Sequence, residues 1–355
     1  MIGSGFEGFA SMWRCARRAG VVLAALLAVW EAGVVQAAVA EPAPAERVLS
    51  WIKSYRDKPE PDLLPEAVRV LAASGAFQEP DAAGVFVGFM AGVVGSNPGK
   101  AERLVRAMLK IDPEDNWAVV RAVAYSGLPN WRRLLERLEP RAPNRHTMIE
   151  AYVSGRLPTL EEFGVMESPS AWARMRSRLP WSAEPPRPGL EPSPVVMDTF
   201  WGYYYATGAL LPLSNIVALL PWSSDFDDAG RLTLGSTAKY SLAVNSSRDA
   251  ELLAALKAAR GYQPAGVVSH LDEVIFAAET AEMGKLKSEA NAALNELRQK
   301  GPAYKRKVSW WGRMGEGAIS LGCITAAVAG QVQLGVPCVV GGATYSATLR
   351  YLSGD

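Results

Sequence analysis

The sequence predicts an all-α fold, and two patterns support this prediction. Apolar residues recur at helical spacing through most of the chain, and many of these stretches end in a small residue followed by glycine. Residues 197–220 show the unit most clearly. Met197 and Trp201 share one helical face, Gly208 stands where a left-handed C-terminal cap is expected, and Leu213 resumes the period. This unit is a helical hairpin.

The same kind of helix end recurs along the chain. The expected ends are Ser74-Gly75, Ser126-Gly127, Ser154-Gly155 and Thr207-Gly208, with Asn245 at the equivalent point of a later unit. Glycine and asparagine tolerate the left-handed conformation that such ends require. The intervals are irregular and no named repeat matches. We therefore expect an irregular helical-hairpin repeat array (solenoid-like) or a helical bundle. The alternative is an ordinary all-helical protein in which glycine ends helices by chance.

Each expected helix has its own periodic stretch, and several have a polar cap or a proline at the start. Asn97-Pro98, Asp112-Pro113 and Ser193-Pro194 read as caps followed by proline, and Thr159 with Glu162 forms a capping box. The pattern from 266 to 300 predicts the longest uninterrupted helix. Further helices are expected near residues 48–55, 63–73, 81–94, 98–109, 113–125, 134–138, 146–153, 194–207, 213–220 and 249–256, with a short one that starts at Ser168-Pro169 and one that runs through Tyr240 to Asn245.

The first forty residues have the layout of a signal peptide. Three arginines lie between residues 14 and 18, an uncharged run follows over 19–30, and small residues lead to Ala40. The run is shorter than the roughly 20 apolar residues of a membrane-spanning helix. We expect cleavage after Ala40, with Ala37 as the alternative site, and a mature protein that is periplasmic or secreted.

A proline-rich stretch gives the best domain boundary. Residues 180–194 contain six prolines in fifteen positions, which excludes a helix or a central strand and favours a linker or a surface strap. The expected divisions are a signal peptide over 1–40, a helical repeat region over 41–179, the linker over 180–194, a C-terminal helical region over 195–307 and an apolar glycine-rich hairpin over 308–355.

Charge and motifs argue against several function classes. The 37 Lys and Arg nearly balance the 36 Asp and Glu, so the totals show no positive field of the kind that binds nucleic acid. No P-loop, dinucleotide fingerprint, nucleophile elbow or zinc-protease motif is present, and no cofactor is expected. The two histidines, His146 and His270, are far apart. His270 is expected to be a surface residue that does not share a face with Asp272 or Glu273. No catalytic residue is assigned, and enzymatic activity stays open.

The densest aromatic group is the candidate binding site. One helix cannot bury all of these side chains on one side, so some are expected to face a neighbour, a groove or solvent. Packing in the core is the alternative explanation, because aromatic residues at helical spacing usually lie there. The group consists of Trp201, Tyr203, Tyr204, Tyr205 and Trp222.

A short acidic loop is a weak calcium candidate. Asp225, Asp227 and Asp228 precede Gly230 with the spacing of the start of a calcium loop. Ser236 stands where such a loop has its bidentate glutamate, so an acidic connector that caps a helix is the alternative.

The C-terminal region lacks charge over residues 318–349, which exceeds the length of a bilayer crossing. Glycines, glutamines and Pro337 divide it into two shorter segments, which favours a helical hairpin. The hairpin either packs in the core or contacts a membrane, and a true span is a third alternative. Membrane-interface candidates precede it, namely Lys305, Arg306, Lys307, Trp310 and Trp311.

Two cysteines, Cys323 and Cys338, remain after removal of a signal peptide that would contain Cys15. In an oxidising compartment they are a disulfide candidate, and two buried free thiols are the alternative.

These observations favour an exported helical binding or scaffold protein of the cell envelope, without enzymatic activity, that contacts another envelope protein. The alternative is a membrane-associated envelope protein or effector that inserts its C-terminal hairpin through 318–349. A third class is an exported hydrolase with an unrecognised carboxylate site, because such sites can be assembled from distant residues.

Overall fold

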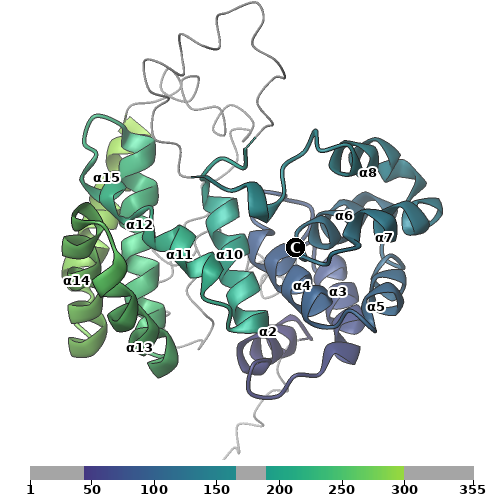
Figure 1. Cartoon of the computed structure of the whole chain (residues 1–355), viewed down its shortest axis with the longest axis horizontal. Coiled ribbons are helices and arrows are strands. Elements are labelled where there is room, and N and C mark those ends of the chain that lie inside the picture. Colours follow the sequence, from purple (N-terminus) through teal and green to yellow (C-terminus); the bar gives the residue numbers. More distant parts are fainter. Residues whose placement is uncertain (1–43, 165–188, 300–355) are drawn as a thin grey trace, which may run out of the picture. The chain divides into compact units, whose positions relative to one another are not determined.

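The computed structural model of the protein describes residues 44–164 and 189–299, and in these ranges the fold is all-α (Figure 1). Thirteen α-helices and short 3₁₀ turns account for the regular structure there, without a β-strand. The helices are α2 (Pro44–Ser54), α3 (Leu64–Ala73), α4 (Gly84–Ser96), α5 (Ala101–Met108), α6 (Asn116–Ala124), α7 (Trp131–Leu138), α8 (His146–Val153), α10 (Pro194–Thr207), α11 (Leu211–Val217), α12 (Ala229–Ser246), α13 (Ala250–Ala259), α14 (Ala265–Thr280) and α15 (Gly284–Gln299).

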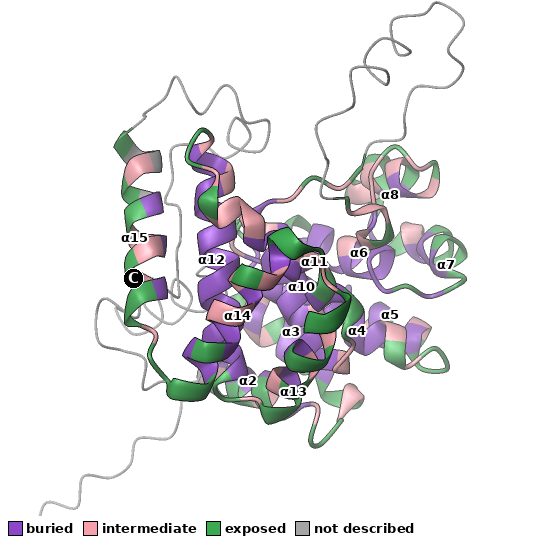
Figure 2. Ribbon diagram, turned by 60° about the vertical axis from the view of Figure 1, so that its left-hand side comes forward, coloured by how far each residue is buried: buried purple, intermediate pink, exposed green. Residues whose placement is uncertain are grey.

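Helix α4 is buried on every side from Gly84 to Val94, because its sequence is apolar or small at each of these positions (Figure 2). Its main neighbour is α10. A Cβ atom added at Gly88 would lie 1.9 Å from the carbonyl oxygen of Thr199, and one added at Gly202 would lie 2.0 Å from that of Val85. The two backbones are therefore in contact, which only glycine allows.

The α4–α10 pair joins the chain before residues 165–188 to the chain after them. A backbone hydrogen bond connects the two sides of this gap, since the N–H of Leu190 donates to the carbonyl of Glu162 at 3.0 Å. Phe163 then packs edge to face against Phe200 of α10 at 4.8 Å between ring centroids. The division of the chain at residues 180–194 stays a prediction.

The first described helix, α2, docks through aromatic side chains. Trp51 and Tyr55 meet Phe89 of α4 in edge-to-face contacts, with ring centroids 5.2 Å apart in each case. Such pairs add about 0.5–1.5 kcal/mol beyond the area they bury. Helices α5 to α8 then follow as short helices, each in contact with its neighbour in the chain, and α6 is buried at every position except Arg121.

Helix α12 organises the C-terminal part of the described chain. Its residues from Ala229 to Ser246 are buried except Arg231, and α14, α15 and the 3₁₀ turn Leu220–Ser224 all pack against it. Several of its hydroxyl side chains donate to carbonyls one turn earlier in the helix, as when Thr237 donates to the carbonyl of Thr233 at 2.6 Å.

The glycine helix ends are confirmed. Gly75, Gly127, Gly155 and Gly208 have φ angles of 75°, 70°, 73° and 67°. The prediction for Asn245 was wrong, because this residue lies inside α12, which continues to Ser246.

The polar caps were predicted with mixed success. Ser193 caps α10 by accepting from the N–H of Val196 at 3.4 Å, and Asp112 accepts from the N–H of Glu114 at 2.8 Å. Asn97, however, closes α4 instead of opening the next helix, and its side chain donates to the carbonyl of Val93 at 2.8 Å.

The prediction of one helix over 266–300 was also wrong. The chain breaks after Thr280, where Ala281 adopts the left-handed conformation with φ of 58°, and α15 turns back. Lys239 of α12 explains the turn, because it pairs with Glu273 of α14 and Glu289 of α15 and so draws the two helices to one neighbour.

The expected signal peptide over 1–40 and the C-terminal hairpin over 308–355 lie outside the described residues. Within residues 44–164 and 189–299, no helix combines the length and the apolar character needed to cross a bilayer.

Candidate functional site

The aromatic group on α10 is packed among neighbouring helices. Trp201 is fully buried, and its indole N–H donates to the hydroxyl of Ser241 on α12 at 3.3 Å. Tyr205 stacks on Trp201 with an interplanar angle of 20°, and its hydroxyl donates to the side-chain oxygen of Asn245 at 3.2 Å. These polar groups are therefore already paired within the protein.

Tyr204 belongs to a polar cluster that links three helices. Its hydroxyl donates to Asp249 at 2.7 Å, and Arg56, just after α2, donates to the same carboxylate oxygen at 2.7 Å. The Arg56 guanidinium also lies 4.8 Å from the centroid of the Tyr204 ring, a cation–π contact. Asp249 in turn caps α13 by accepting from the N–H of Leu252 at 3.0 Å. The cluster thus ties α2, α10 and the start of α13 together.

The protonation states in this cluster follow from its contacts. Burial opposes the charge on Asp249, but hydrogen bonds from Leu252, Tyr204 and Arg56 outweigh this cost and hold its pKa below the usual value. Burial, and then the hydrogen bond to Asp249, raise the pKa of the Tyr204 hydroxyl. At neutral pH the charged Asp249 carboxylate therefore accepts hydrogen bonds from the neutral Tyr204 hydroxyl and from the Arg56 guanidinium. The cluster holds the three helices together and has no group that readily gives up a proton.

The two other aromatic candidates also have partners. The hydroxyl of Tyr203, whose pKa burial raises, lies 3.5 Å from the carbonyl of Ser126 at the end of α6. Trp222 is half-buried, with the guanidinium of Arg231 4.4 Å from its ring centroid. The five candidates therefore face several different neighbours and do not line one surface, and their role in ligand binding stays a prediction.

The acidic loop before α12 is a connector in the described structure. Asp228 caps α12 by accepting from the N–H groups of Gly230 and Arg231 at 2.9 and 3.0 Å, and Asp225 pairs with the Arg231 guanidinium at 2.9 Å. Asp227 is exposed. Within the described ranges, no three His, Cys, Asp or Glu side chains are grouped so that they could hold one metal ion.

A second polar cluster was missed by the sequence analysis. Lys239 is 4% exposed, and its ammonium lies 2.7 Å from Glu273 and 3.2 Å from Glu289. Lys285 adds a contact of 3.1 Å to Glu273. The signal in the sequence was a single lysine among small and apolar residues in the middle of α12.

His270 lies beside this cluster, contrary to the prediction that it is a surface residue separate from Glu273. Its ring is half-buried, and burial and then the Lys239 charge lower its pKa, while Glu273 and Glu289 oppose the shift. Its Nδ1 lies 3.4 Å from the hydroxyl of Ser223.

The Ser223–His270 contact does not have the geometry of an activated nucleophile. The Ser223 hydroxyl has one proton, and it donates this proton to the carbonyl of Leu220 at 2.7 Å. His270 must then donate to Ser223 and cannot act as the base that accepts its proton. The arrangement holds the 3₁₀ turn against α14.

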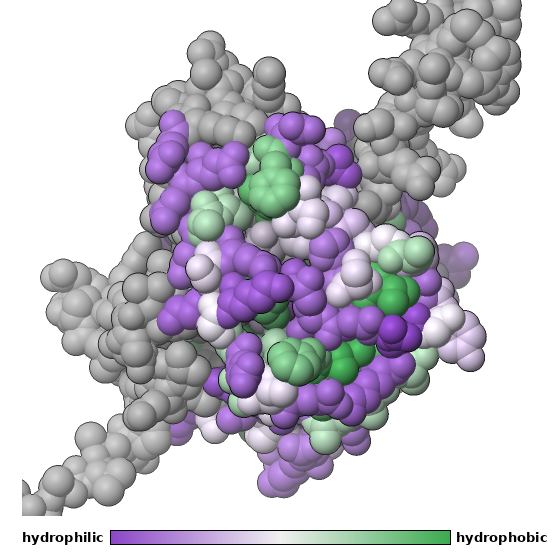
Figure 3. Space-filling view, turned by 90° about the vertical axis from the view of Figure 1, so that its left-hand side faces the viewer, coloured by the Kyte–Doolittle hydropathy of each residue, from purple (hydrophilic) through white to green (hydrophobic). Residues whose placement is uncertain are grey.

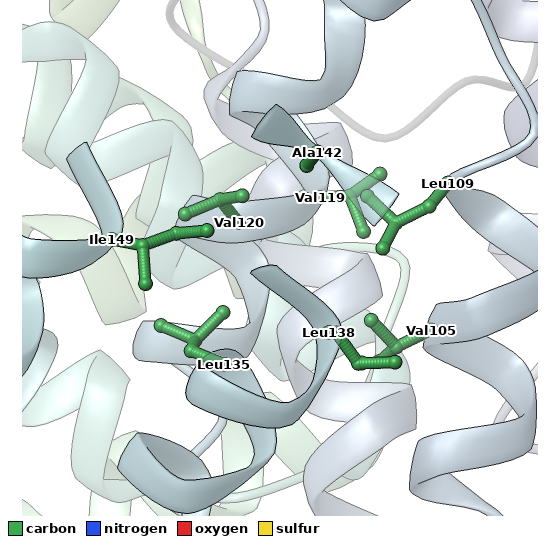
Figure 4. Close-up of a pocket in the computed structure, with 8 residues that line it drawn as sticks. All are labelled: Val105, Leu109, Val119, Val120, Leu135, Leu138, Ala142 and Ile149. Atoms are coloured by element: carbon green, nitrogen blue, oxygen red, sulfur yellow. The ribbon is translucent and has the colours of Figure 1, made fainter. Parts of the chain in front are cut away.

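An apolar cavity lies between α5, α6, α7 and α8 (Figure 4). Its volume is about 10 Å³, at the lower limit for one water molecule, and its lining has no polar side chain that could hold one. The cavity is a packing defect. It is lined by Val105, Leu109, Val119, Val120, Leu135, Leu138, Ala142 and Ile149.

The remaining candidates lie outside the described residues. These are the disulfide candidates Cys323 and Cys338 and the membrane-interface candidates Lys305, Arg306, Lys307, Trp310 and Trp311.

No protein-family model, characterised protein or solved structure matches the chain significantly.

Proposed function

We propose that the chain is an exported helical binding or scaffold protein of the cell envelope that acts without catalysis by contacting another envelope protein. The observation that carries this proposal is a pair of consecutive exposed leucines. Leu210 and Leu211, at the turn between α10 and α11, are 54% and 77% exposed. Turns are usually polar, and burial of a leucine side chain is worth about 1.5–3 kcal/mol, so a partner that covers both gains substantial affinity.

The position of the pair makes it a firm contact point. Gly208 reverses the chain immediately before it, and Pro212 and Leu213 behind it are buried. The Arg56–Asp249 ion pair lies close to Gly208, since a Cβ there would be 3.4 Å from the Arg56 side chain. The two exposed leucines therefore lie at a turn whose neighbouring residues are buried or in contact with Arg56.

One face of the protein shows separate apolar groups. On the face shown in Figure 3, hydrophobic residues form several separate groups among hydrophilic ones. Contacts between successive helices from α5 to α8 are consistent with the proposed helical-hairpin array, which we retain as part of the proposal.

Site-specific photo-crosslinking in cells tests the proposal. A photoreactive phenylalanine analogue at Leu211 is expected to give a discrete adduct with one envelope protein, and Leu210→Ser is expected to reduce its yield. Tyr262, which is 90% exposed, provides the matched control position. An adduct pattern identical at both positions, or none at Leu211 in correctly exported protein, would contradict a specific contact at this turn.

Membrane association is the second candidate function, supported by the uncharged stretch 318–349. Fractionation of full-length and tail-deleted protein into soluble and carbonate-washed membrane fractions distinguishes it. Retention that requires residues 309–355 supports insertion of the tail, and equal soluble recovery of both forms counts against it.

A further inference from the structure

The exposed sides of α5 and α7 form a basic surface. Both helices are amphipathic, with buried leucine, valine and methionine on one side and charged residues on the other (Figure 2). We call the exposed cations of this surface the basic face. They are Lys100, Arg103, Arg106, Lys110, Arg132, Arg133, Arg137 and Arg141.

This face has a local surplus of positive charge that the balanced total conceals. Residues 100–141 contain nine basic and six acidic side chains, a net charge of +3, whereas residues 189–299 contain eight basic and thirteen acidic side chains, a net charge of −5. The protein therefore has a strong charge asymmetry between these two parts of its chain, and a local field of this kind selects partners.

Glu136 is also exposed on α7, and two further acidic side chains, Asp62 and Glu102, are each shared between two cations of the face. Asp62 accepts from both Lys100, at 2.9 Å, and Arg103. Glu102 pairs with Arg106 at 2.7 Å and with Arg137 at 2.9 Å. Each group of one carboxylate and two cations keeps a net positive charge.

The cations of the two helices belong to one continuous surface. The ion pair between Arg137 of α7 and Glu102 of α5 bridges the helices on the outside. On the inside, Val105 of α5 and Leu138 of α7 line the same cavity (Figure 4). On α7, Arg133 and Arg137 are four residues apart and so lie along one stripe, and the exposed Arg141 follows in the 3₁₀ turn Glu139–Arg141.

An exposed apolar side chain stands at the edge of this surface. Leu63 is 47% exposed and directly follows Asp62, the residue paired with Lys100 and Arg103. Cations beside an exposed leucine suit a partner that offers anionic groups above an apolar layer. We propose that the basic face binds the surface of a lipid bilayer that contains anionic phospholipids.

The arginine content favours a partner that carries phosphate groups, and the exposed Leu63 favours lipid among such partners. Six of the eight cations are arginine, whose planar guanidinium binds phosphate oxygens bidentately. A nucleic acid would place its phosphates against the carboxylates of Asp62 and Glu102 and would leave Leu63 in water, whereas lipid headgroups can move away from a carboxylate and let a leucine enter the interface. This inference concerns a surface distinct from the Leu210–Leu211 turn and is independent of the proposed function.

Vesicle co-sedimentation of the full mature chain tests the proposal. Binding to vesicles of phosphatidylcholine with phosphatidylglycerol is compared with binding to phosphatidylcholine alone, at low and physiological ionic strength. Each basic residue near an anionic surface contributes roughly fivefold to the partition coefficient. Arg133→Gln with Arg141→Gln is therefore expected to weaken binding about 25-fold. Both side chains are exposed, so an unchanged thermal transition is expected.

The matched control removes the same charge elsewhere. Arg248→Gln with Lys257→Gln, also exposed, is expected to leave vesicle binding unchanged within about twofold. Loss of binding only in the Arg133/Arg141 variant, only with anionic lipid and less at higher salt, supports the proposal. The proposal is overturned if the two double variants bind anionic vesicles equally well, or if the native protein binds neutral vesicles as well as anionic ones. If the Arg133/Arg141 variant instead loses affinity for single-stranded DNA or polyglutamate with vesicle binding unchanged, the lipid assignment is wrong.

Discussion

The contact between α4 and α10 gives a prediction with a definite sign. In Gly88→Ala, the new Cβ would lie 1.9 Å from the carbonyl oxygen of Thr199, whereas such a contact normally needs about 3.3 Å, so the helices must separate by more than about 1 Å. Both atoms belong to backbone, which cannot rotate away. Overpacking typically costs about 1–3 kcal/mol, and the upper value applies here. Alanine is about 1 kcal/mol more favourable than glycine inside a helix, so the expected net loss in the free energy of unfolding is about 2 kcal/mol.

The assay is urea unfolding followed by circular dichroism, with Gly266→Ala as the control. Gly266 lies in the first turn of α14, where nothing is within 4 Å of an added Cβ, so the same substitution is expected to stabilise by about 0.5 kcal/mol. Gly202→Ala acts on the same helix pair, and because one separation relieves both clashes, the double variant is expected to lose less than the two single losses combined. A neutral or stabilising Gly88→Ala would show that α4 and α10 do not approach this closely.

Three further substitutions test the polar clusters and the helix break. Lys239→Met leaves Glu273 and Glu289 half-buried and facing each other, with only the exposed Lys285 to compensate, and is expected to destabilise by about 3 kcal/mol in urea unfolding. Ala281→Gly relieves the strain of a left-handed backbone at the turn and is expected to stabilise the protein by about 1 kcal/mol. The control is Gly261→Ala, at a glycine without a positive φ angle and with no atom within 4 Å of an added Cβ. Asp249→Asn keeps the helix cap but removes the charge. Because the pKa of Asp249 is lowered on folding, its contribution is fully present above about pH 5 and is lost as pH falls through the folded value, so the stability difference from the native protein, about 1.5 kcal/mol at pH 7, should vanish at low pH. A difference that does not change with pH would contradict this assignment.

The features that could be predicted from the sequence are those set by local chemistry. Gly75 and Gly208 end helices because their left-handed backbone is a property of a few consecutive residues, and Ser193 caps α10 for the same reason. Asn245 shows the limit of this reasoning. It tolerates a helix end, but α12 is buried around it and packing carries the helix one residue further.

The break at Ala281 could not be predicted because its cause lies elsewhere in the chain. Residues 266–299 favour a helix except at Gly284, where α15 begins, and the left-handed turn itself falls on Ala281, which is strained because it is not glycine. The gain comes from packing α15 against α12 and from Glu289 reaching Lys239, a pair separated by 50 residues. A periodic pattern indicates which residues are buried, but it does not indicate whether they reach their packing partner in one straight helix or after a turn.

The aromatic residues of α10 show how the same reasoning bears on function. These side chains point to several sides of the helix, and each side has its own neighbour: Trp201 contacts Ser241 of α12, and Tyr203 contacts Ser126 at the end of α6. A helix enclosed on several sides can hold aromatic residues on several faces, so their density here reports burial. Substitution of Tyr204 would therefore lower stability whether or not the protein binds a ligand. Variants at the exposed Leu211 and on the basic face separate binding from folding, because removal of an exposed side chain costs the fold little.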